Sequence, residues 1–142
     1  MKRAENYMKL YLPSLSVNEG LARCAVASFV AQLNPTLEEI SDIKCAVSEA
    51  VTNSIVHGYK YSQGVIYIGV KYYSDRTVII EITDKGCGIE NVAEAMTPLF
   101  TTDTTGERSG MGFAVMQTFM DKLVVTSKEG SGVSILMSKQ LK

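Results

Sequence analysis

Residues 48–58 read SEAVTNSIVHG, and this stretch sets three polar side chains at intervals of four residues. On a helix, Glu49, Asn53 and His57 would form one slowly drifting row, because residues four apart point in nearly the same direction. Small and apolar residues fill most of the positions between them. Taken singly, each polar residue has an ordinary explanation: an exposed glutamate, a surface asparagine, and a histidine beside a glycine at a helix end.

The sequence on both sides of this stretch predicts further helices and strands. Thr36 and Glu39 form a capping box that starts the helix, which is expected to run to about Tyr59. Its buried stripe is expected to consist of Ile40, Ile43, Val47, Ala50, Val51 and Ser54. Other apolar patterns predict helices over 17–33 and 113–120 and strands over 6–12, 64–73, 77–83, 123–127 and 132–138. This order predicts an α/β two-layer sandwich: a mixed, mostly antiparallel sheet with helices on one face.

The composition describes one globular domain spanning residues 1–142. Hydrophobic residues make up 46% of the chain and charged residues 20%, a balance that excludes a disordered protein. A net charge of −1 without any Lys/Arg run argues against nucleic-acid binding. Three cysteines without a C-x-x-C spacing favour reduced thiols over disulfides or a zinc site. The first residues do not form a signal peptide, so we expect a cytoplasmic protein without a membrane anchor.

Two glycine clusters follow downstream. Asp84 ends a β-rich run and is followed by Gly86 and Gly88, which would let the backbone approach a flat ligand closely. Residues 106–112, GERSGMG, open a helix whose free N–H groups and positive dipole end suit phosphates, and Arg108 adds a cation there. Either cluster alone also fits an ordinary turn or a flexible loop.

Together, the three signals resemble the Bergerat-type (GHKL) ATP-binding family of gyrase, the Hsp90 chaperone, histidine kinases and the MutL repair ATPase. Residues 49–58 resemble its N box, 84–89 its first glycine box and 108–113 its second. Nearly the whole chain is further similar to one branch of this family, the serine-kinase anti-sigma factors of sporulation.

The resemblance implies roles for individual residues. Asn53 would supply an amide oxygen to Mg²⁺, Glu49 would accept the proton of the attacking hydroxyl, and Asp84 would accept from the exocyclic amine of adenine. Residues 97–109 would act as a lid over the triphosphate. Arg108 would assist catalysis at the terminal phosphate. Further contacts to the nucleotide are expected from Gly86, Gly88, Thr101, Thr102, Arg108, Ser109, Gly110, Met111 and Gly112.

The implied function is ATP-dependent phosphorylation of a serine on an anti-anti-sigma protein, combined with sequestration of a sigma factor of the sigma F type. Arg23 matches a partner-binding position of the family, and a homodimer is implied, with the strand over 6–12 as the expected interface. The alternative is a nucleotide-responsive clamp without kinase activity, which the presence of Glu49 disfavours. The catalytic part of a histidine kinase is also disfavoured, since no phosphoacceptor-bearing helices precede the domain in this sequence.

One position departs from the family pattern. Relatives often carry Gly-x-Gly-Thr between the last two strands, whereas residues 130–133 here read GSGV. Val133 cannot donate the hydrogen bond of that threonine. Either Ser131 or water substitutes, or the purine is held less tightly, or position 133 is only a strand residue. The role of His57 also stays open.

Overall fold

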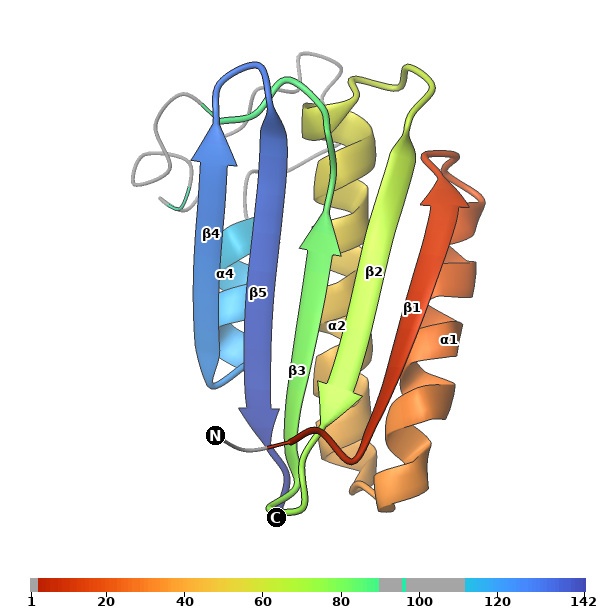
Figure 1. The fold of residues 1–142 in the computed structure, drawn as a ribbon, viewed down its shortest axis with the longest axis vertical. Helices are drawn as coiled ribbons and strands as arrows, with labels where there is room; N and C mark the ends of the chain where they lie inside the picture. Colours follow the sequence, from red (N-terminus) through yellow and green to blue (C-terminus); the bar gives the residue numbers. More distant parts are fainter. Residues whose placement is uncertain (1–2, 90–95, 97–111) are drawn as a thin grey trace.

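The computed structural model describes residues 3–89, 96 and 112–142. In these ranges, one antiparallel sheet has the strand order β1-β2-β3-β5-β4. Its strands are β1 (Asn6–Pro13), β2 (Val65–Tyr72), β3 (Thr77–Thr83), β4 (Lys122–Lys128) and β5 (Gly132–Gln140). The described α-helices, which cover one face of the sheet (Figure 1), are α1 (Asn18–Val30), α2 (Leu37–Asn53) and α4 (Gly112–Phe119). The expected two-layer sandwich is confirmed.

Helix α2 lies in the middle of the helical layer, in contact with both α1 and α4. It starts at the predicted capping box, in which Thr36 Oγ1 accepts from the Glu39 amide at 3.1 Å and Glu39 Oε1 accepts from the Thr36 amide at 2.9 Å. Of the predicted buried stripe, only Ile40 is partly exposed. The central strands contribute alternate buried residues to the same core: Ile66, Ile68, Val70, Val78, Ile80, Ile82, Ile135 and Met137.

Each fully buried Val or Ile side chain stabilises the fold by about 1.5–3 kcal/mol relative to an exposed one. This shared core therefore fixes α2 on the sheet, and with it the position of the last residue of the helix. None of the helices in the described ranges is long and apolar enough to cross a membrane.

The end of α2 differs from the prediction. The α-helix stops at Asn53, and one π-helical turn, Ser54–Gly58, follows before Tyr59. The Tyr59 amide donates to Ser54 O at 2.8 Å, five residues back instead of four. The helical segment therefore ends beside Tyr59 as predicted, but its last turn is π-helical and not α-helical.

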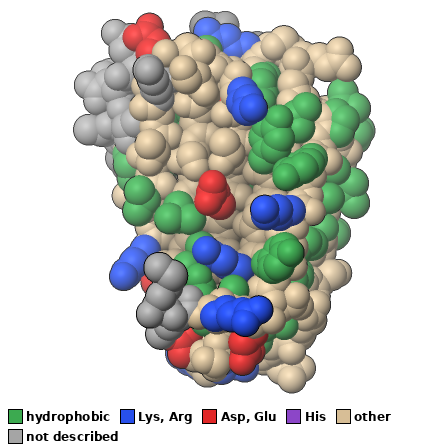
Figure 2. Space-filling view, viewed as in Figure 1, with side chains coloured by type: hydrophobic (Ala, Val, Ile, Leu, Met, Phe, Trp, Pro, Cys, Tyr) green, Lys and Arg blue, Asp and Glu red, His purple; other side chains and the backbone are tan. Residues whose placement is uncertain are grey.

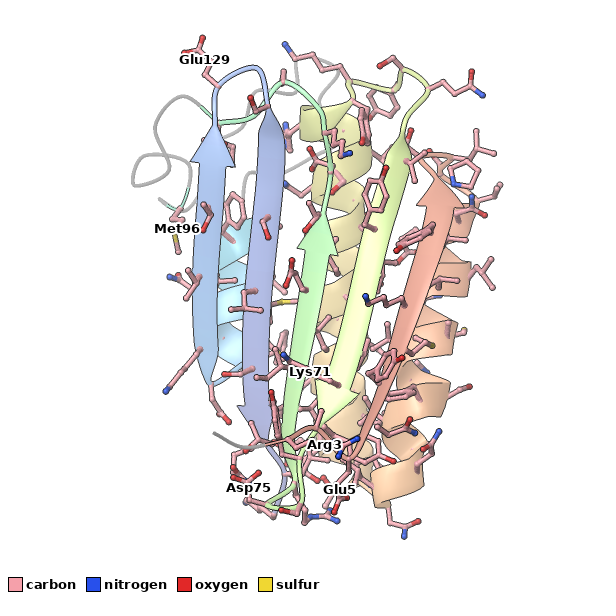
Figure 3. The ribbon with its side chains drawn as sticks, viewed as in Figure 1. Arg3, Glu5, Lys71, Asp75, Met96 and Glu129 are labelled. Carbon is pink, nitrogen blue, oxygen red and sulfur yellow. The ribbon has the colours of Figure 1, made fainter. Side chains whose placement is uncertain are left out.

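No helix of the described ranges covers the other face of the sheet. Figure 2 shows this face, on which apolar side chains lie among basic ones. Tyr7, Tyr11 and Leu136 are exposed members of it. Figure 3 marks the two ends of the sheet: Asp75 lies at the β2–β3 hairpin, and Glu129 at the β4–β5 turn. Of the predicted nucleotide-binding residues, Asp84 and Gly86 lie at the Glu129 end, where Cys87 O accepts from the Gly130 amide.

Candidate nucleotide-binding site

Three segments that are distant in sequence meet at this end of the sheet (Figure 1). They are the π turn after α2, the residues 84–88 that follow β3, and the β4–β5 turn. The Cys87 amide donates to Gly58 O at 2.9 Å, and the Gly130 amide donates to Cys87 O at 2.6 Å. The first glycine box is therefore tied by its backbone to the end of the N box on one side and to the last β-turn on the other.

Two glycines allow this close packing. A Cβ atom on Gly86 would lie 2.1 Å from the backbone oxygen of Gly58. A Cβ atom on Gly58 would lie 2.9 Å from Oδ2 of Asp84. Both distances are shorter than real Cβ contacts, so any side chain would push the segments apart. Gly86 is thus required for the contact between the two boxes, a reason that the sequence did not reveal.

Asp84 is the most buried charged residue of the site, with 2% of its surface exposed. Its Oδ1 accepts from the Gly86 amide at 2.9 Å and from the Val133 amide at 3.3 Å, whereas its Oδ2 has no partner. Burial raises the pKa of Asp84 above its ordinary value, and the hydrogen bonds from the Gly86 and Val133 amides, together with the polar Ser54 hydroxyl nearby, oppose this effect. The free Oδ2 is an acceptor in buried surroundings that still needs a donor.

Asn53 also has a buried side-chain atom without a hydrogen-bond partner. The residue is 8% exposed, and its side-chain Nδ2 is buried without a hydrogen-bond partner. Among the residues that the structure describes, Asn53 Nδ2 and Asp84 Oδ2 are the two buried side-chain polar atoms in this condition. A buried atom left unsatisfied costs about 1–3 kcal/mol, and such atoms are rare in native proteins. Their position in the two predicted boxes indicates a surface built for a polar ligand.

The donor set fits magnesium–ATP. An asparagine side chain offers an oxygen, the kind of ligand that Mg²⁺ prefers, and an NH₂ group that can donate to a phosphate oxygen. A buried carboxylate oxygen suits the exocyclic amine of a purine. The described residues contain no cluster of three or more His, Cys, Asp or Glu that could hold a metal ion by protein ligands alone. A magnesium ion would depend on phosphate oxygens and water in addition to Asn53.

Glu49 lies one turn before Asn53 in α2. It is partly buried and lines a hollow of about 380 Å³ on the outer side of α2. The other lining residues are Arg23 from α1, Val115 from α4, and Ser41, Lys44, Cys45 and Ser48 from α2. Arg23 contacts Glu19 at 3.2 Å and Ser48 at 3.4 Å. The structure thus brings the predicted partner-binding arginine and the predicted proton acceptor to one hollow.

Two positions left open by the sequence act through their backbone. The carbonyl oxygen of His57 accepts from the Cys87 thiol at 3.1 Å. Val133 donates its amide to Asp84 Oδ1 and accepts from the Asp84 amide at 2.9 Å. The hydroxyl next to Val133 is that of Ser134, which accepts from Thr83 Oγ1 at 3.2 Å. Valine at position 133 therefore keeps Asp84 in place without a side-chain hydroxyl.

Sequence reasoning missed Tyr59, whose hydroxyl accepts from the Lys85 amide at 2.8 Å. An aromatic residue directly after the N box was the available signal. Gly112 is the first residue of α4, so the second glycine box opens a helix as predicted. The whole of the expected lid, 97–109, lies outside the described residues. So do the remaining predicted contacts: Thr101, Thr102, Arg108, Ser109, Gly110 and Met111.

Comparison with known proteins agrees with this geometry. A sequence model of the family described as "Histidine kinase-like ATPase domain" matches residues 12–139. The anti-sigma F factor of Clostridium acetobutylicum is 52% identical over 136 residues, covering 96% of this chain and 94% of the relative. That of Clostridium novyi is 55% identical over 139 residues, covering 96% of both chains.

Two solved structures share the fold. A Mycobacterium tuberculosis structure containing RsbU and RsbW domains aligns with a TM-score of 0.69 at 19% identity, covering 96% of this chain and 32% of that one. The catalytic domain of the histidine kinase ThkA aligns with a TM-score of 0.56 at 15% identity, covering 96% of both.

The fold and the site define an ATP-binding domain of the histidine kinase-like ATPase class. Within this class, the chain belongs to the anti-sigma F factor family.

Proposed function

We propose that this protein holds a sigma factor of the sigma F type inactive and uses ATP to phosphorylate a serine of an anti-anti-sigma protein. The observation that carries the proposal is the pair of buried atoms without partners, Asn53 Nδ2 and Asp84 Oδ2. We assign both atoms to one nucleotide-binding site, and Glu49 is one helical turn from Asn53. A nucleotide with a donor amine and phosphate oxygens would satisfy both atoms.

Asp84 would select the purine. Its Oδ2 is a buried acceptor, and the exocyclic amine of adenine is a donor. Guanine carries a carbonyl oxygen at the same ring position. With GTP bound, this oxygen and Asp84 Oδ2 would be two facing acceptors, buried from water and without a donor between them. Leaving such groups unpaired costs about 1–3 kcal/mol. ATP is therefore expected to bind about tenfold or more tightly than GTP.

Asn53 would hold magnesium through its amide oxygen. The last turn of α2 is fixed by the core, so the amide is positioned before the nucleotide arrives. Magnesium, when bound, would offset the negative charge of the phosphates during transfer. Asn53 orients the triphosphate, and its NH₂ group is available to a phosphate oxygen.

Glu49 would accept the proton of the substrate serine. A general base must lie within hydrogen-bond reach of the hydroxyl, and the hollow beside Glu49 gives a protein segment access to it. Arg23 and Lys44 make the rim of this hollow cationic, which suits a segment with acidic side chains. The serine would thus approach along the outer side of α2.

We further propose that the protein acts in the cytoplasm as a homodimer. Strand β1 is at one edge of the sheet and pairs only with β2 among the described strands. Such an edge can pair with the same edge of a second copy. Tyr7 and Tyr11 lie exposed on this strand and would add apolar contacts near the two-fold axis.

The kinase assignment is tested by incubating the protein with γ-labelled ATP, Mg²⁺ and the anti-anti-sigma protein. Label is expected on a serine of that partner, and Glu49→Gln should lower the transfer roughly 100- to 10,000-fold while ATP still binds. If the wild-type protein binds ATP and the sigma factor but transfers no label, the clamp without kinase activity is the correct function.

A further inference from the structure

The segment that carries Asp84 is held by an unbroken series of backbone hydrogen bonds. Four consecutive amides, from Asp84 to Cys87, each find an acceptor. The bonds are Asp84 N to Val133 O at 2.9 Å, Lys85 N to Tyr59 Oη at 2.8 Å, Gly86 N to Asp84 Oδ1 at 2.9 Å and Cys87 N to Gly58 O at 2.9 Å. Two acceptors are backbone oxygens and one belongs to Asp84 itself. The only acceptor from a side chain elsewhere in the chain is the Tyr59 hydroxyl.

Tyr59 is held in place independently of this bond. Its ring packs on Gly64, where a Cβ atom would lie 2.4 Å from the ring. Its backbone amide closes the π turn at Ser54 O. The hydroxyl also donates to Val65 O at 2.6 Å, so it bridges the start of β2 and the residue after Asp84.

We propose that Tyr59 is a positioning residue that sets the purine specificity of the site. Its hydroxyl fixes the backbone of Lys85, and the carboxylate of Asp84, one residue earlier, is fixed with it. The inference rests on the proposed function, in which Asp84 Oδ2 reads the adenine amine. Tyr59 does not touch the reacting atoms and acts only through Asp84.

Removing the Tyr59 hydroxyl should change only the surroundings of Asp84, because other contacts keep the Tyr59 ring and the Lys85 side chain in place. When the hydroxyl is removed, the ring still fills the space over Gly64, and the Lys85 ammonium still lies 5.3 Å from the centre of the Tyr67 ring. The Lys85 amide loses its acceptor, so this one peptide gains freedom to turn. Discrimination between the adenine amine and the guanine carbonyl depends on the direction of Asp84 Oδ2. Rotation of the Lys85 peptide would alter this direction.

The test compares Tyr59→Phe with wild type and with Tyr73→Phe, which removes a hydroxyl beside the hairpin at the other end of the sheet. Dissociation constants for ATP and GTP are measured with Mg²⁺, GTP by competition, and thermal melting is followed in parallel. Loss of the hydroxyl removes two exposed hydrogen bonds, from the Lys85 amide and to Val65 O, and we expect ATP binding about 3- to 10-fold weaker in Tyr59→Phe. GTP binding should stay within twofold, so the ATP:GTP ratio falls by about 3- to 10-fold.

Tyr73→Phe should keep the wild-type ratio. The inference is overturned if Tyr59→Phe also keeps it, or if Tyr59→Phe weakens both nucleotides equally, since that would mark a purely structural role. A wild-type protein that binds neither nucleotide, or binds both equally, would refute the proposed purine reading by Asp84 itself, and the two failures are therefore distinguishable.

Discussion

The α-carbon of Gly58 faces the carboxylate of Asp84 so closely that a methyl group on it would lie 2.9 Å from Oδ2 and 3.0 Å from Cγ. The N box and the first glycine box are therefore fitted to each other at the atom that we assign to purine recognition. A single methyl group added at position 58 would therefore displace the Asp84 carboxylate while leaving Asp84 itself unchanged.

Gly58→Ala is expected to weaken ATP binding by about tenfold or more, because the methyl group must move the Asp84 carboxylate. Alanine itself favours helical backbone over glycine by about 0.5–1 kcal/mol, which limits any loss of stability. Gly69→Ala is the matched control, since a Cβ atom there has no neighbour within 4 Å. Titration calorimetry measures both variants. Equal ATP affinity in the two would contradict the fitted contact.

Glu39 is expected to matter for stability and not for the nucleotide. Hydrogen bonds from the amides of Thr36 and Lys142 lower the pKa of this carboxyl. Because its folded pKa is depressed, its stabilising contribution is present above the unfolded pKa and is lost as pH falls through the folded pKa. Glu39→Gln keeps one acceptor for the Thr36 amide but turns an NH₂ group toward the Lys142 amide, so it should cost about 0.5–1.5 kcal/mol near neutral pH.

Urea unfolding of Glu39→Gln between pH 3 and 7 measures this effect. The variant's stability should fall less steeply on the acid side than that of wild type. Glu38→Gln, which changes the exposed neighbouring acid in the first turn of α2, is the control. A wild-type pH profile in Glu39→Gln would exclude the assigned hydrogen bonds as the cause.

Arg23→Ala should separate partner binding from nucleotide binding. Arg23 lies in the hollow beside Glu49 and contacts the helix neighbour Glu19 and Ser48. A half-exposed pair of this kind contributes under about 1 kcal/mol to folding. ATP affinity should stay within twofold of wild type, while affinity for the protein partners falls tenfold or more. Unchanged partner affinity in a surface-binding assay would remove Arg23 from the interface.

The proposed dimer predicts a specific effect of proline in β1. The Ser14 amide donates to Gly64 O at 2.9 Å, so alternation along the strand points the amide of Lys9 away from β2. Lys9→Pro removes no bond within the sheet but blocks pairing with a second copy at this edge. Analytical ultracentrifugation should show a monomer for Lys9→Pro and a dimer for wild type and Lys9→Ala. A dimeric Lys9→Pro would place the interface elsewhere.

Much of the fold follows from local patterns in the sequence. Alternating apolar residues located each strand to within two residues at either end, and the Thr36–Glu39 box marked the first turn of α2. The π turn over 54–58 was not predictable, because apolar spacing does not separate a π turn from one more α-helical turn.

The site was predicted as a set of boxes, and the contacts between them were not. Asn53 and Asp84 were found because their residue types in order resemble a known family. The bridge from Tyr59 to Lys85, and the hollow shared by Arg23 and Glu49, join residues of different elements. Such contacts depend on how the helices and strands pack, which no local pattern specifies.

The buried charge of Asp84 affects both the stability of the fold and the binding of ATP. Burial raises its pKa, so the folded protein binds a proton at pH values where the unfolded chain has released it. Stability therefore falls as pH rises from the ordinary carboxyl range through the raised folded pKa, and ionised Asp84 remains a cost at neutral pH. Asparagine has nearly the same shape, keeps an oxygen for the Gly86 and Val133 amides, and carries no charge.

The most direct test of the account is one comparison of wild type with Asp84→Asn at neutral pH, by thermal melting without nucleotide and by calorimetric titration with Mg²⁺ and ATP. We predict that the variant melts a few degrees higher, because the buried negative charge that destabilises the fold is removed. We also predict that it binds ATP at least tenfold more weakly, because the carboxylate oxygen that accepts from adenine is lost. A variant that binds ATP as tightly as wild type, and discriminates against GTP equally well, would contradict the assignment of Asp84 as the purine-reading residue.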